Sequence, residues 1–288
     1  MFEPIKQVEL SRDVFRLLRD LIRDYSGIYF NDNSLGLLQR RLCGRLQEHN
    51  MNDFRDYYRF LLYNKNREEE LSIIMDILTV NETYFFREKN QLDAFSNEIL
   101  HMLKERNSKT RRIRIFSAGC STGEEPYTLA MLILESRLFL GWDIEIFGGD
   151  INRRVLQAAR RGIYRENSFR TTDQYYIDRY FSKQQQGTYR INDNVKKLVN
   201  FGYINLLNTD KLLFLGRMDV IFCRNVLIYF DLPSRKKVID GFYRILNDDG
   251  FLLLGHAESL INISTDFELK HLKHDLVYQK PAKGSKRE

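Results

Sequence analysis

The sequence contains little cysteine and no long hydrophobic run. Its three cysteines, Cys43, Cys120 and Cys223, lie far apart among 288 residues, so they form no disulfide framework and favour an intracellular protein. No apolar run approaches the roughly 20 residues that a membrane-spanning helix needs. The N-terminus, MFEPIKQVEL, lacks the pattern of a signal peptide. Because 43% of the residues are hydrophobic, these absences predict a cytoplasmic globular protein with a substantial core.

The sequence also lacks the usual signs of metal or nucleic-acid binding. Of the five histidines, only His271 and His274 have a metal-ligand spacing, and further ligands are missing nearby, so we predict no metal site. The net charge of +6 is compatible with an acidic partner. Long basic blocks with interleaved aromatic residues are absent, so we expect no nucleic-acid partner. We also expect no membrane insertion, and a monomer.

The pattern of apolar residues predicts two different parts. Residues 1–80 contain four segments with apolar residues at helical spacing, which predicts an all-helical N-terminal domain. Residues 81–110 are predicted to be a connecting segment with a helix at 91–106. From residue 111 onward, short apolar strands alternate with helices, which is typical of an α/β domain with a mainly parallel sheet. The predicted strands are 112–116, 144–147, 198–201, 219–223 and 251–254, and the predicted helices are 126–137, 153–161 and 233–246.

Two further features modify the α/β domain, which we assign to residues 111–288. Residues 164–197 are polar and rich in tyrosine, and we interpret them as a small inserted β-subdomain. Near the end, FELKHLKHDLVYQK alternates between apolar and polar residues like a β-hairpin, so the last strands are expected to be antiparallel.

The segment SAGCSTGEEPY at 117–127 is predicted to be a ligand-binding loop between a strand and a helix. Its small residues allow a ligand to approach the backbone closely. Asp150 ends the next predicted strand, and an acid at this position commonly binds ribose hydroxyls. The alternative is that Asp150 only caps the helix that begins near Asn152.

The charge of this loop indicates which ligand it binds. Glu124 and Glu125 would repel a pyrophosphate, and the GxGxxG spacing is absent, so NAD fits poorly. S-adenosylmethionine carries a ribose, a sulfonium and an ammonium group, and it suits these carboxylates. The alternative for either glutamate is a favourable charge in the first turn of a helix. We expect Glu125 to contact the cofactor and Glu124 to be the helix-terminus charge.

Three other segments carry candidate site residues. NETYFFRE contains Asn81, Thr83 and Arg87; an arginine can clamp a carboxylate, although Asn81 is equally well explained as a helix N-cap. IFCRNVLIYFD places Arg224 and Asn225 at the end of a buried strand, where a charged side chain needs a partner. LLLGHAES ends another strand, where His256 is either a polar wall of the pocket or a hydrogen-bonded structural histidine.

Arginines form two patterns in the N-terminal helices. Arg12, Arg16, Arg19 and Arg23 lie on one stripe, which we interpret as a solvated face that pairs with the intervening aspartates. The second pattern consists of Arg40, Arg41 and Arg45, and no acidic residue follows it before Glu48. We predict that this second helix docks an acidic partner helix.

Together these segments resemble the CheR-type chemotaxis receptor methyltransferases. The resemblance rests on TVNETYFFRE, FSAGCSTGEEPYTLA, GGDIN, INLL, IFCRNVLIYFD and LLGHAES, in that order, and covers nearly the whole chain. It implies a class I, Rossmann-like methyltransferase sheet. It also implies methyl transfer from S-adenosylmethionine to glutamate side chains in the cytoplasmic domains of methyl-accepting chemotaxis receptors.

The resemblance also implies roles for individual residues. Cofactor contacts are expected from Asn81, Thr83, Arg87, Glu124 or Glu125, Asp150, Asn205, Leu206, Arg224 and Asn225. Arg87, Arg224 and Tyr229 are the expected catalytic residues, and in this family a basic face of the N-terminal helices contacts the receptor. A receptor peptide can also dock on the β-subdomain, but the short SKQQQGTYRIN segment leads us to expect that no such tether is used.

Two rival functions stay open from the sequence. One is methylation of another carboxylate substrate. The other is a non-catalytic module that senses S-adenosylmethionine or binds receptors. The expected chemistry needs little from the protein beyond alignment, because a glutamate side chain with an ordinary pKa of about 4.3 is already ionised at pH 7.

Overall fold

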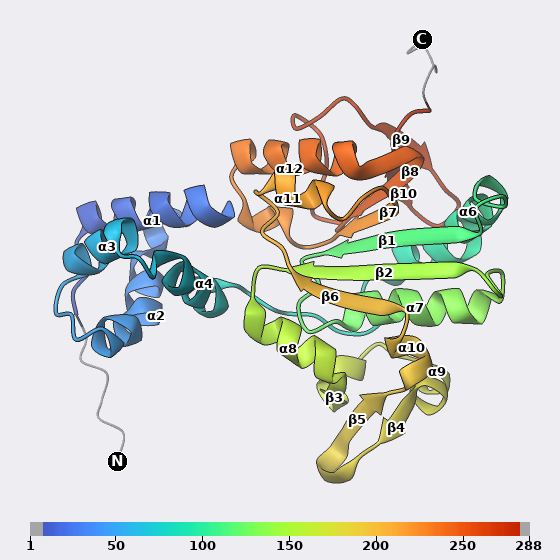
Figure 1. The fold of residues 1–288 in the computed structure, drawn as a ribbon, viewed down its shortest axis with the longest axis horizontal. Helices are drawn as coiled ribbons and strands as arrows, with labels where there is room; N and C mark the ends of the chain where they lie inside the picture. The colour runs from blue at the N-terminus through green and yellow to red at the C-terminus, as the bar shows by residue number, and fades with distance from the viewer. Residues whose placement is uncertain (1–7, 283–288) are drawn as a thin grey trace. The chain divides into compact units, whose positions relative to one another are not determined.

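A computed structural model describes residues 8–282, and these residues form two compact units. The first unit combines the residues up to Val80 with the short segment Tyr229–Ser234. The second unit contains Asn81–Ile228 and the residues from Arg235 onward. Figure 1 shows the all-helical character of the first unit and the central sheet of the second.

In the part of the first unit that the structure describes, four helices pack with a returning segment of the chain. Its helices are α1 (Arg12–Ser26), α2 (Leu35–Glu48), α3 (Phe54–Tyr63) and α4 (Arg67–Leu78), with a short 3-10 turn at Asp32–Ser34. α1 begins where the Ser11 side chain accepts a hydrogen bond from the Val14 amide, and it ends at Gly27, which has a φ of 80°. Segment 229–234 joins this unit through a β-bridge between Ile28 and Phe230.

A buried ion pair holds three of these helices together. Arg45 on α2 is only 7% exposed, and its Nε and Nη2 atoms lie 2.8 and 2.6 Å from the two carboxylate oxygens of Glu70 on α4. Glu70 also accepts a 2.5 Å hydrogen bond from the Tyr57 hydroxyl on α3, and His49 Nε2 lies 3.0 Å away. Burial alone would raise the pKa of Glu70, but these hydrogen bonds together bring it below its ordinary value.

This arrangement bears on the docking face predicted for α2, which stays a prediction. The Arg45 guanidinium is buried against Glu70 and is not presented to a partner. Arg41 is half-buried and donates to the carbonyl oxygens of Ile77 and Leu78 in the last turn of α4. Arg40 is exposed. The sequence pattern therefore reflected helix packing and capping at two of its three positions.

The first stripe of arginines pairs with aspartates, as the solvated-face interpretation predicts. Arg16 lies 3.9 Å from Asp13, and Arg19 and Arg23 both contact Asp20 at 3.1 and 3.4 Å. These contacts leave the stripe electrically compensated by its own helix.

The second unit is organised around a twisted sheet. Among the described residues its strand order is β6-β2-β1-β7-β8-β10-β9. The first five of these strands run parallel, and β10 pairs antiparallel with β8 and β9. This order is typical of class I methyltransferases. The strands are β1 (Arg112–Ala118), β2 (Asp143–Asp150), β6 (Val199–Tyr203), β7 (Met218–Cys223), β8 (Leu246–Leu254), β9 (Glu268–His271) and β10 (Leu276–Gln279).

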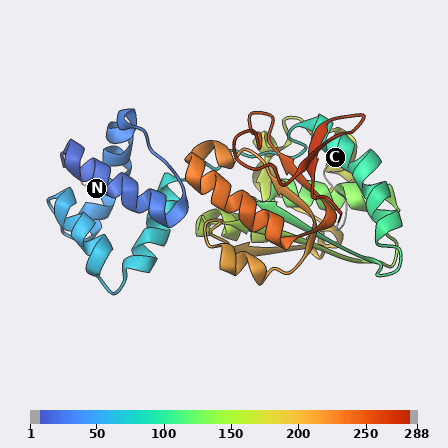
Figure 2. The same ribbon diagram turned by 90° about the horizontal axis from the view of Figure 1, so that it is seen from above.

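Helices cover both faces of this sheet (Figures 1 and 2). Successive residues of β1 point to opposite faces: Phe116 contacts Phe242 of α12, whereas Ser117 bonds to Glu125 of α7. The Phe222 ring of β7 packs against Phe95, which begins the π-helical turn between α5 and α6. The helices are α5 (Lys89–Ala94), a π-helical turn (Phe95–Ile99), α6 (Leu100–Arg106), α7 (Glu124–Ser136), α8 (Arg153–Arg161), α11 (Thr209–Leu213) and α12 (Leu232–Ile245).

The predicted insertion is a small subdomain with its own sheet. It contains β3 (Ile163–Arg165), β4 (Phe181–Lys183) and β5 (Thr188–Ile191) in the antiparallel order β3-β5-β4, with α9 (Gln174–Tyr180) and α10 (Asp193–Lys196). Phe85 contacts the rings of Tyr164, Phe169 and Phe181, with centroids 4.8, 5.2 and 5.0 Å away. One aromatic residue of the connecting segment therefore anchors the subdomain to the main unit.

Most predicted elements match the structure to within a few residues. α8 spans the predicted residues, and the predicted terminal hairpin corresponds to the antiparallel pair β9–β10. β2 and β8 extend beyond their predicted bounds. A search of the described residues finds no helix that is both long and apolar enough to cross a bilayer.

Candidate functional site

The glycine-rich loop joins β1 to α7 at the carboxyl edge of the sheet. Gly119 and Gly123 have φ values of 75° and 92°, in the region that favours glycine. A β-carbon at Gly123 would also lie 2.9 Å from the β-carbon of Ala159. Ser121, a non-glycine residue with a φ of 49°, lies between them. The small residues of SAGCSTG are thus required by the backbone conformation and by the close approach of α8.

Asp150, at the end of β2, holds this loop through a hydrogen bond to its backbone. One carboxylate oxygen accepts a 2.8 Å hydrogen bond from the Ser121 amide, and the other accepts one of 2.8 Å from the Asn152 amide. The side chain that caps α8 is that of Asn152, which accepts from the Val155 amide. Asp150 therefore connects two loops at the sheet edge and is not itself the N-cap residue.

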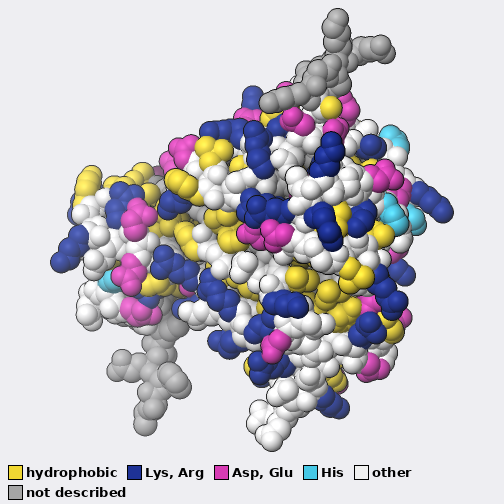
Figure 3. Space-filling model, turned by 45° about the vertical axis from the view of Figure 1, so that its right-hand side comes forward, with side chains coloured by type: hydrophobic (Ala, Val, Ile, Leu, Met, Phe, Trp, Pro, Cys, Tyr) yellow, Lys and Arg dark blue, Asp and Glu magenta, His cyan; other side chains and the backbone are white. Residues whose placement is uncertain are grey.

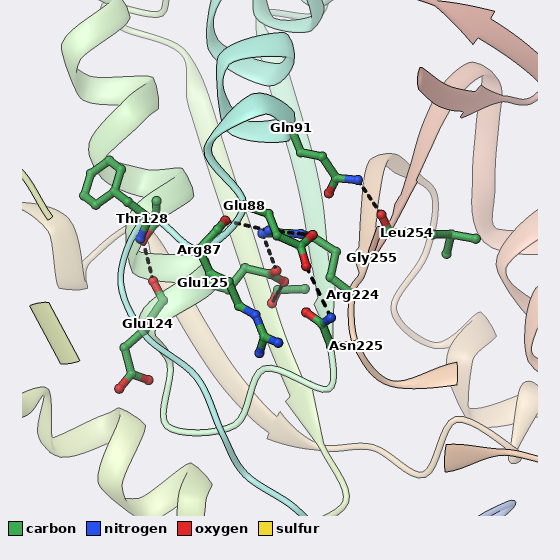
Figure 4. A network of polar contacts seen from close by, with 12 residues as sticks. Arg87, Glu88, Gln91, Glu124, Glu125, Thr128, Arg224, Asn225, Leu254 and Gly255 are labelled. Carbon is green, nitrogen blue, oxygen red and sulfur yellow. Dashed lines mark hydrogen bonds and ion pairs between the residues drawn. The ribbon is translucent and has the colours of Figure 1, made fainter. Parts of the chain in front are cut away.

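Glu124 and Glu125 are neighbours in the sequence, but their side chains have different surroundings (Figure 4). Glu124 is 2% exposed and accepts hydrogen bonds from the hydroxyls of Thr122 at 2.6 Å and Ser168 at 3.1 Å. Ser168 belongs to the inserted subdomain, so Glu124 connects α7 to that part of the chain. Burial raises the pKa of the Glu124 carboxyl.

Glu125 faces the end of β7 instead. Its carboxylate accepts a 2.7 Å hydrogen bond from the Ser117 hydroxyl and lies 3.1 Å from Nη1 of Arg224. Burial raises the pKa of Glu125, and the charge of Arg224 offsets this effect only in part. β1 and β7 are adjacent strands whose following helices cover opposite faces of the sheet. Ligands of open α/β sheets bind at such a reversal.

Arg224 is the centre of a buried charge cluster that we call the Arg224 cluster, which consists of Glu88, Glu125 and Arg224 (Figure 4). The Arg224 side chain is 3% exposed and contacts Glu88 at 3.1 Å as well as Glu125. It also donates to the carbonyl oxygen of Arg87. Burial alone would raise the pKa of Glu88, but the charge and hydrogen bonds of Arg224 lower it below its ordinary value. With both glutamates ionised, the cluster carries a net charge of −1.

Glu258 holds the loop that follows Arg224. One of its carboxylate oxygens accepts hydrogen bonds from the amides of Asn225 and Gly255, both at 2.8 Å. The other accepts from the amides of Val226 and Ile228 at 2.9 and 3.2 Å. Asn225 has a φ of 60°, and a backbone in this strained conformation persists where its surroundings determine it. The hydrogen bonds to Glu258 hold the turn after β7 in this conformation.

The connecting segment contributes a second polar side of the site. The Ser121 hydroxyl donates to the Asn81 carbonyl, which joins this segment to the glycine-rich loop. Arg87 donates to the Glu82 carbonyl at 3.0 Å and lies 5.6 Å from the Tyr84 ring centroid. Within residues 8–282, the Arg87 guanidinium makes no ion pair with a carboxylate. α5 begins only at Lys89, so Asn81 is not the N-cap of a helix.

The remaining predicted residues lie in several places. The Asn205 side chain accepts a 3.0 Å hydrogen bond from the Leu207 amide and stabilises the turn after β6, beside the buried Leu206. Thr83 is half-buried in the connecting segment. His256 is exposed and lies 3.6 Å from Asp275. Tyr229 belongs to the first compact unit, whose α1–α2 loop donates a backbone hydrogen bond to its carbonyl.

Sequence reasoning missed two carboxylates of this site. Glu88 stood within the motif NETYFFRE, and Glu258 within LLLGHAES, but neither was given a role. A signal for Glu88 was the buried charge predicted at Arg224, because a buried guanidinium requires a carboxylate partner. No local pattern distinguishes Glu258, since its four partners are backbone amides.

Comparison with known proteins gives separate family matches for the helical part and the α/β part of the chain. Residues 81–276 match the model of the CheR methyltransferase, SAM binding domain, and residues 13–79 match that of the CheR methyltransferase, all-alpha domain. Chemotaxis protein methyltransferase 2 of Vibrio cholerae is 38% identical over 281 residues, which cover 97% of each chain. Chemotaxis protein methyltransferase of Escherichia coli is 30% identical over 273 residues, which cover 94% of this chain and 92% of that protein.

Proposed function

Because the chain belongs to the CheR methyltransferase family, we propose that it methylates glutamate side chains of methyl-accepting chemotaxis receptors. The methyl donor of this family is S-adenosylmethionine. The finer assignment, to glutamate and to receptors, is supported by the names of the relatives. The observation that carries methyl transfer is the Arg224 cluster, a buried site with one more carboxylate than cation, which suits a cationic methyl donor.

The donor groups of the site suit S-adenosylmethionine. Glu125, at the start of α7, would bind the cationic amino-acid end, because its carboxylate is only partly neutralised by Arg224. Arg87 has no carboxylate partner among the described residues and would bind the cofactor carboxylate. Asp150 would bind the ribose hydroxyls, and Asn205 and Leu206 would flank the adenine.

The proposed reaction requires alignment more than proton transfer. S-adenosylmethionine supplies an electrophilic methyl group attached to a positively charged sulfur. The receptor glutamate is ionised at pH 7 and needs no general base. Arg224 and Asn225, held by Glu88 and Glu258, would lie beside the methyl group and the substrate carboxylate. Tyr229 stays a predicted catalytic residue on the family resemblance alone. Exclusion of water favours the reaction, because the two opposite charges neutralise each other as it proceeds.

A methyl-transfer assay tests this function directly. The full chain is incubated with tritiated S-adenosylmethionine and the purified cytoplasmic domain of a chemoreceptor from the same organism. We expect incorporated label that mild base releases as methanol, because carboxyl methyl esters are base-labile. A receptor domain with its candidate glutamates changed to aspartate is the matched control.

Two outcomes would contradict the proposal. Label that survives base treatment would indicate methylation of a different kind of group. Cofactor binding in calorimetry without any transfer to receptor domains would indicate a sensing module instead of an enzyme.

A further inference from the structure

The positive charge of this chain is concentrated in one segment. Residues 153–165, RRVLQAARRGIYR, contain five arginines and no acidic residue. The other 275 residues hold 40 basic and 39 acidic side chains, so they are almost balanced. We call the surface formed by these side chains the α8 arginine face; it comprises Arg153, Arg154, Arg160, Arg161 and Arg165. A local excess of this size produces a directed field, unlike an evenly spread charge.

The structure places these arginines on the outside of α8 and β3. α8 buries Val155, Leu156 and Ala159 against the unit, and all five arginines are exposed. In the space-filling view, dark blue side chains are more frequent than magenta ones over the lower part of the picture, where the inserted subdomain lies (Figure 3).

The arginines of α8 form two parallel rows. Arg153 and Arg160 are seven residues apart, and so are Arg154 and Arg161. Seven residues are close to two helical turns, so each pair lies on one side of the helix about 10.5 Å apart. Two rows at this spacing match carboxylates that also recur after two turns of a partner helix.

Three arginines of this face are not neutralised by the described part of the chain, unlike the stripe on α1. Within the described residues 8–282, Arg160, Arg161 and Arg165 make no ion pair with an acidic side chain. Arg160 donates to the Phe201 carbonyl, and the Lys196 ammonium donates to the Arg161 carbonyl, which brings a further cation to the same surface. By contrast, Arg16, Arg19 and Arg23 of α1 all contact aspartates.

Helix stability accounts for Arg160 and Arg161, which lie in the last turn of α8, but not for the two arginines at its start. Arg153 and Arg154 lie in the first turn of α8, which contains no acidic residue. The partial positive charge at a helix N-terminus disfavours cations there. Arginines that oppose the helix dipole indicate a use outside the helix. The face also begins three residues after Asp150, at the sheet edge that carries the candidate site.

We propose that the α8 arginine face docks an acidic helical segment of the methyl-accepting protein. This inference rests on the proposed function, which makes a protein the substrate. It assigns receptor recognition to a surface of the second unit, whereas the α2 arginines predicted for docking are largely engaged within the first unit. The expected partner carries pairs of carboxylates about 10 Å apart along one helix face.

Charge reversal in the full chain tests the docking face. We expect R160E/R161E to raise the KM for a chemoreceptor cytoplasmic domain about tenfold at low salt, with kcat and the Kd for S-adenosylmethionine unchanged. The difference should shrink as salt approaches about 0.5 M, because exposed charges are screened. K236E/K237E on α12 is the matched control, since it makes the same change in net charge at exposed lysines.

A second variant and a second probe keep the test independent of folding and of catalysis. R161E/R165E leaves the Arg160–Phe201 hydrogen bond intact and should raise KM in the same direction. A labelled alanine-rich helical peptide with glutamate pairs seven residues apart should bind the wild type more tightly than a peptide with the same composition and scrambled spacing. R160E/R161E should abolish that preference.

The outcomes separate this inference from the proposed function. An unchanged KM in both variants, with normal methylation by the wild type, overturns the docking face and leaves the function standing. Absence of methylation by the wild type contradicts the function, while the peptide measurement still tests the face. Loss of binding to vesicles of anionic lipid in the variants, with receptor binding intact, would assign the face to a membrane and overturn the inference.

Discussion

Each of the two compact units buries an arginine against carboxylates, and the two surroundings differ in charge balance. Arg45 in the first unit is matched by one buried carboxylate, Glu70, which Tyr57 and His49 also contact. Its second partner, Glu48, has a side chain that is 66% exposed. Arg224 in the second unit contacts two carboxylates whose side chains are only 13% and 17% exposed.

The difference shows how a structural ion pair is distinguished from a binding site. In the Arg45 pair, the buried charges cancel and the oxygens of Glu70 are occupied by donors from α2 and α3. In the Arg224 cluster, one negative charge remains, and Glu125 keeps a raised pKa despite its arginine neighbour. A buried excess charge is costly unless another ion compensates it, so the second unit is suited to a cationic ligand.

Removing the arginine from each unit should give the largest effects and separate the two cases. We expect Arg45→Met and Arg224→Met each to lower the free energy of unfolding by about 3–5 kcal/mol, because each leaves a carboxylate buried without its partner. Only Arg224→Met should also weaken S-adenosylmethionine binding, by about 100-fold, because Glu125 and the Arg87 backbone lose the side chain that positions them. Urea unfolding and calorimetry at low temperature measure the two quantities. Weakened cofactor binding in folded Arg45→Met would break the comparison.

Exchanging the adjacent glutamates for glutamine sharpens the assignment within the second unit. Glu125→Gln should raise the Kd for S-adenosylmethionine roughly 10- to 100-fold, because a hydrogen bond to a charged group is lost. Glu124→Gln should change this Kd little, since a glutamine can still pair with the Thr122 and Ser168 hydroxyls. Equal effects in the two variants, measured by calorimetry, would contradict the different surroundings.

The smallest expected effects concern pH. Because the pKa of Glu125 is raised, its proton should bind at a higher pH than for an ordinary glutamate, and cofactor affinity should fall as pH decreases through that range. The pKa of Glu70 is lowered, so its contribution to stability is present above the unfolded value of about 4.3 and is lost as pH falls below it. As pH is lowered, calorimetry should therefore show the affinity for S-adenosylmethionine falling at a higher pH than the stability of the fold. A Glu125→Gln variant with an unchanged pH profile of affinity would exclude Glu125 as the titrating group.

The fold was largely predictable because local patterns determine it. Apolar runs specified β1 and β7, and the helical spacing of leucines specified the first unit. The inserted sheet was predictable from a break in the alternation, although its anchor, Phe85, was not assigned to it. The extra length of β8 was missed, because the polar residues Asn247, Asp248 and Asp249 do not look like part of a strand.

The arrangement of the candidate site was predictable where neighbouring strands end at the same edge of the sheet. The glycine-rich loop follows β1 and Asp150 ends β2, and the structure joins them through the Ser121 amide. The pairing of charges was not predictable, because it depends on contacts between distant segments. Glu88 and Arg224 are 136 residues apart, and the same long-range pairing removed Arg45 from the predicted docking face.

The return of Tyr229–Ser234 to the first unit has a practical consequence for dividing the protein. The β-bridge from Phe230 to Ile28 means that the helical unit is assembled from two stretches of chain separated by about half of the sequence. A fragment that ends at Val80 therefore lacks a piece of its own unit. A catalytic fragment that begins at Asn81 carries that piece without its partner. Fragment studies should connect segment 229–234 to the helices by a designed linker, instead of cutting the chain at residue 80.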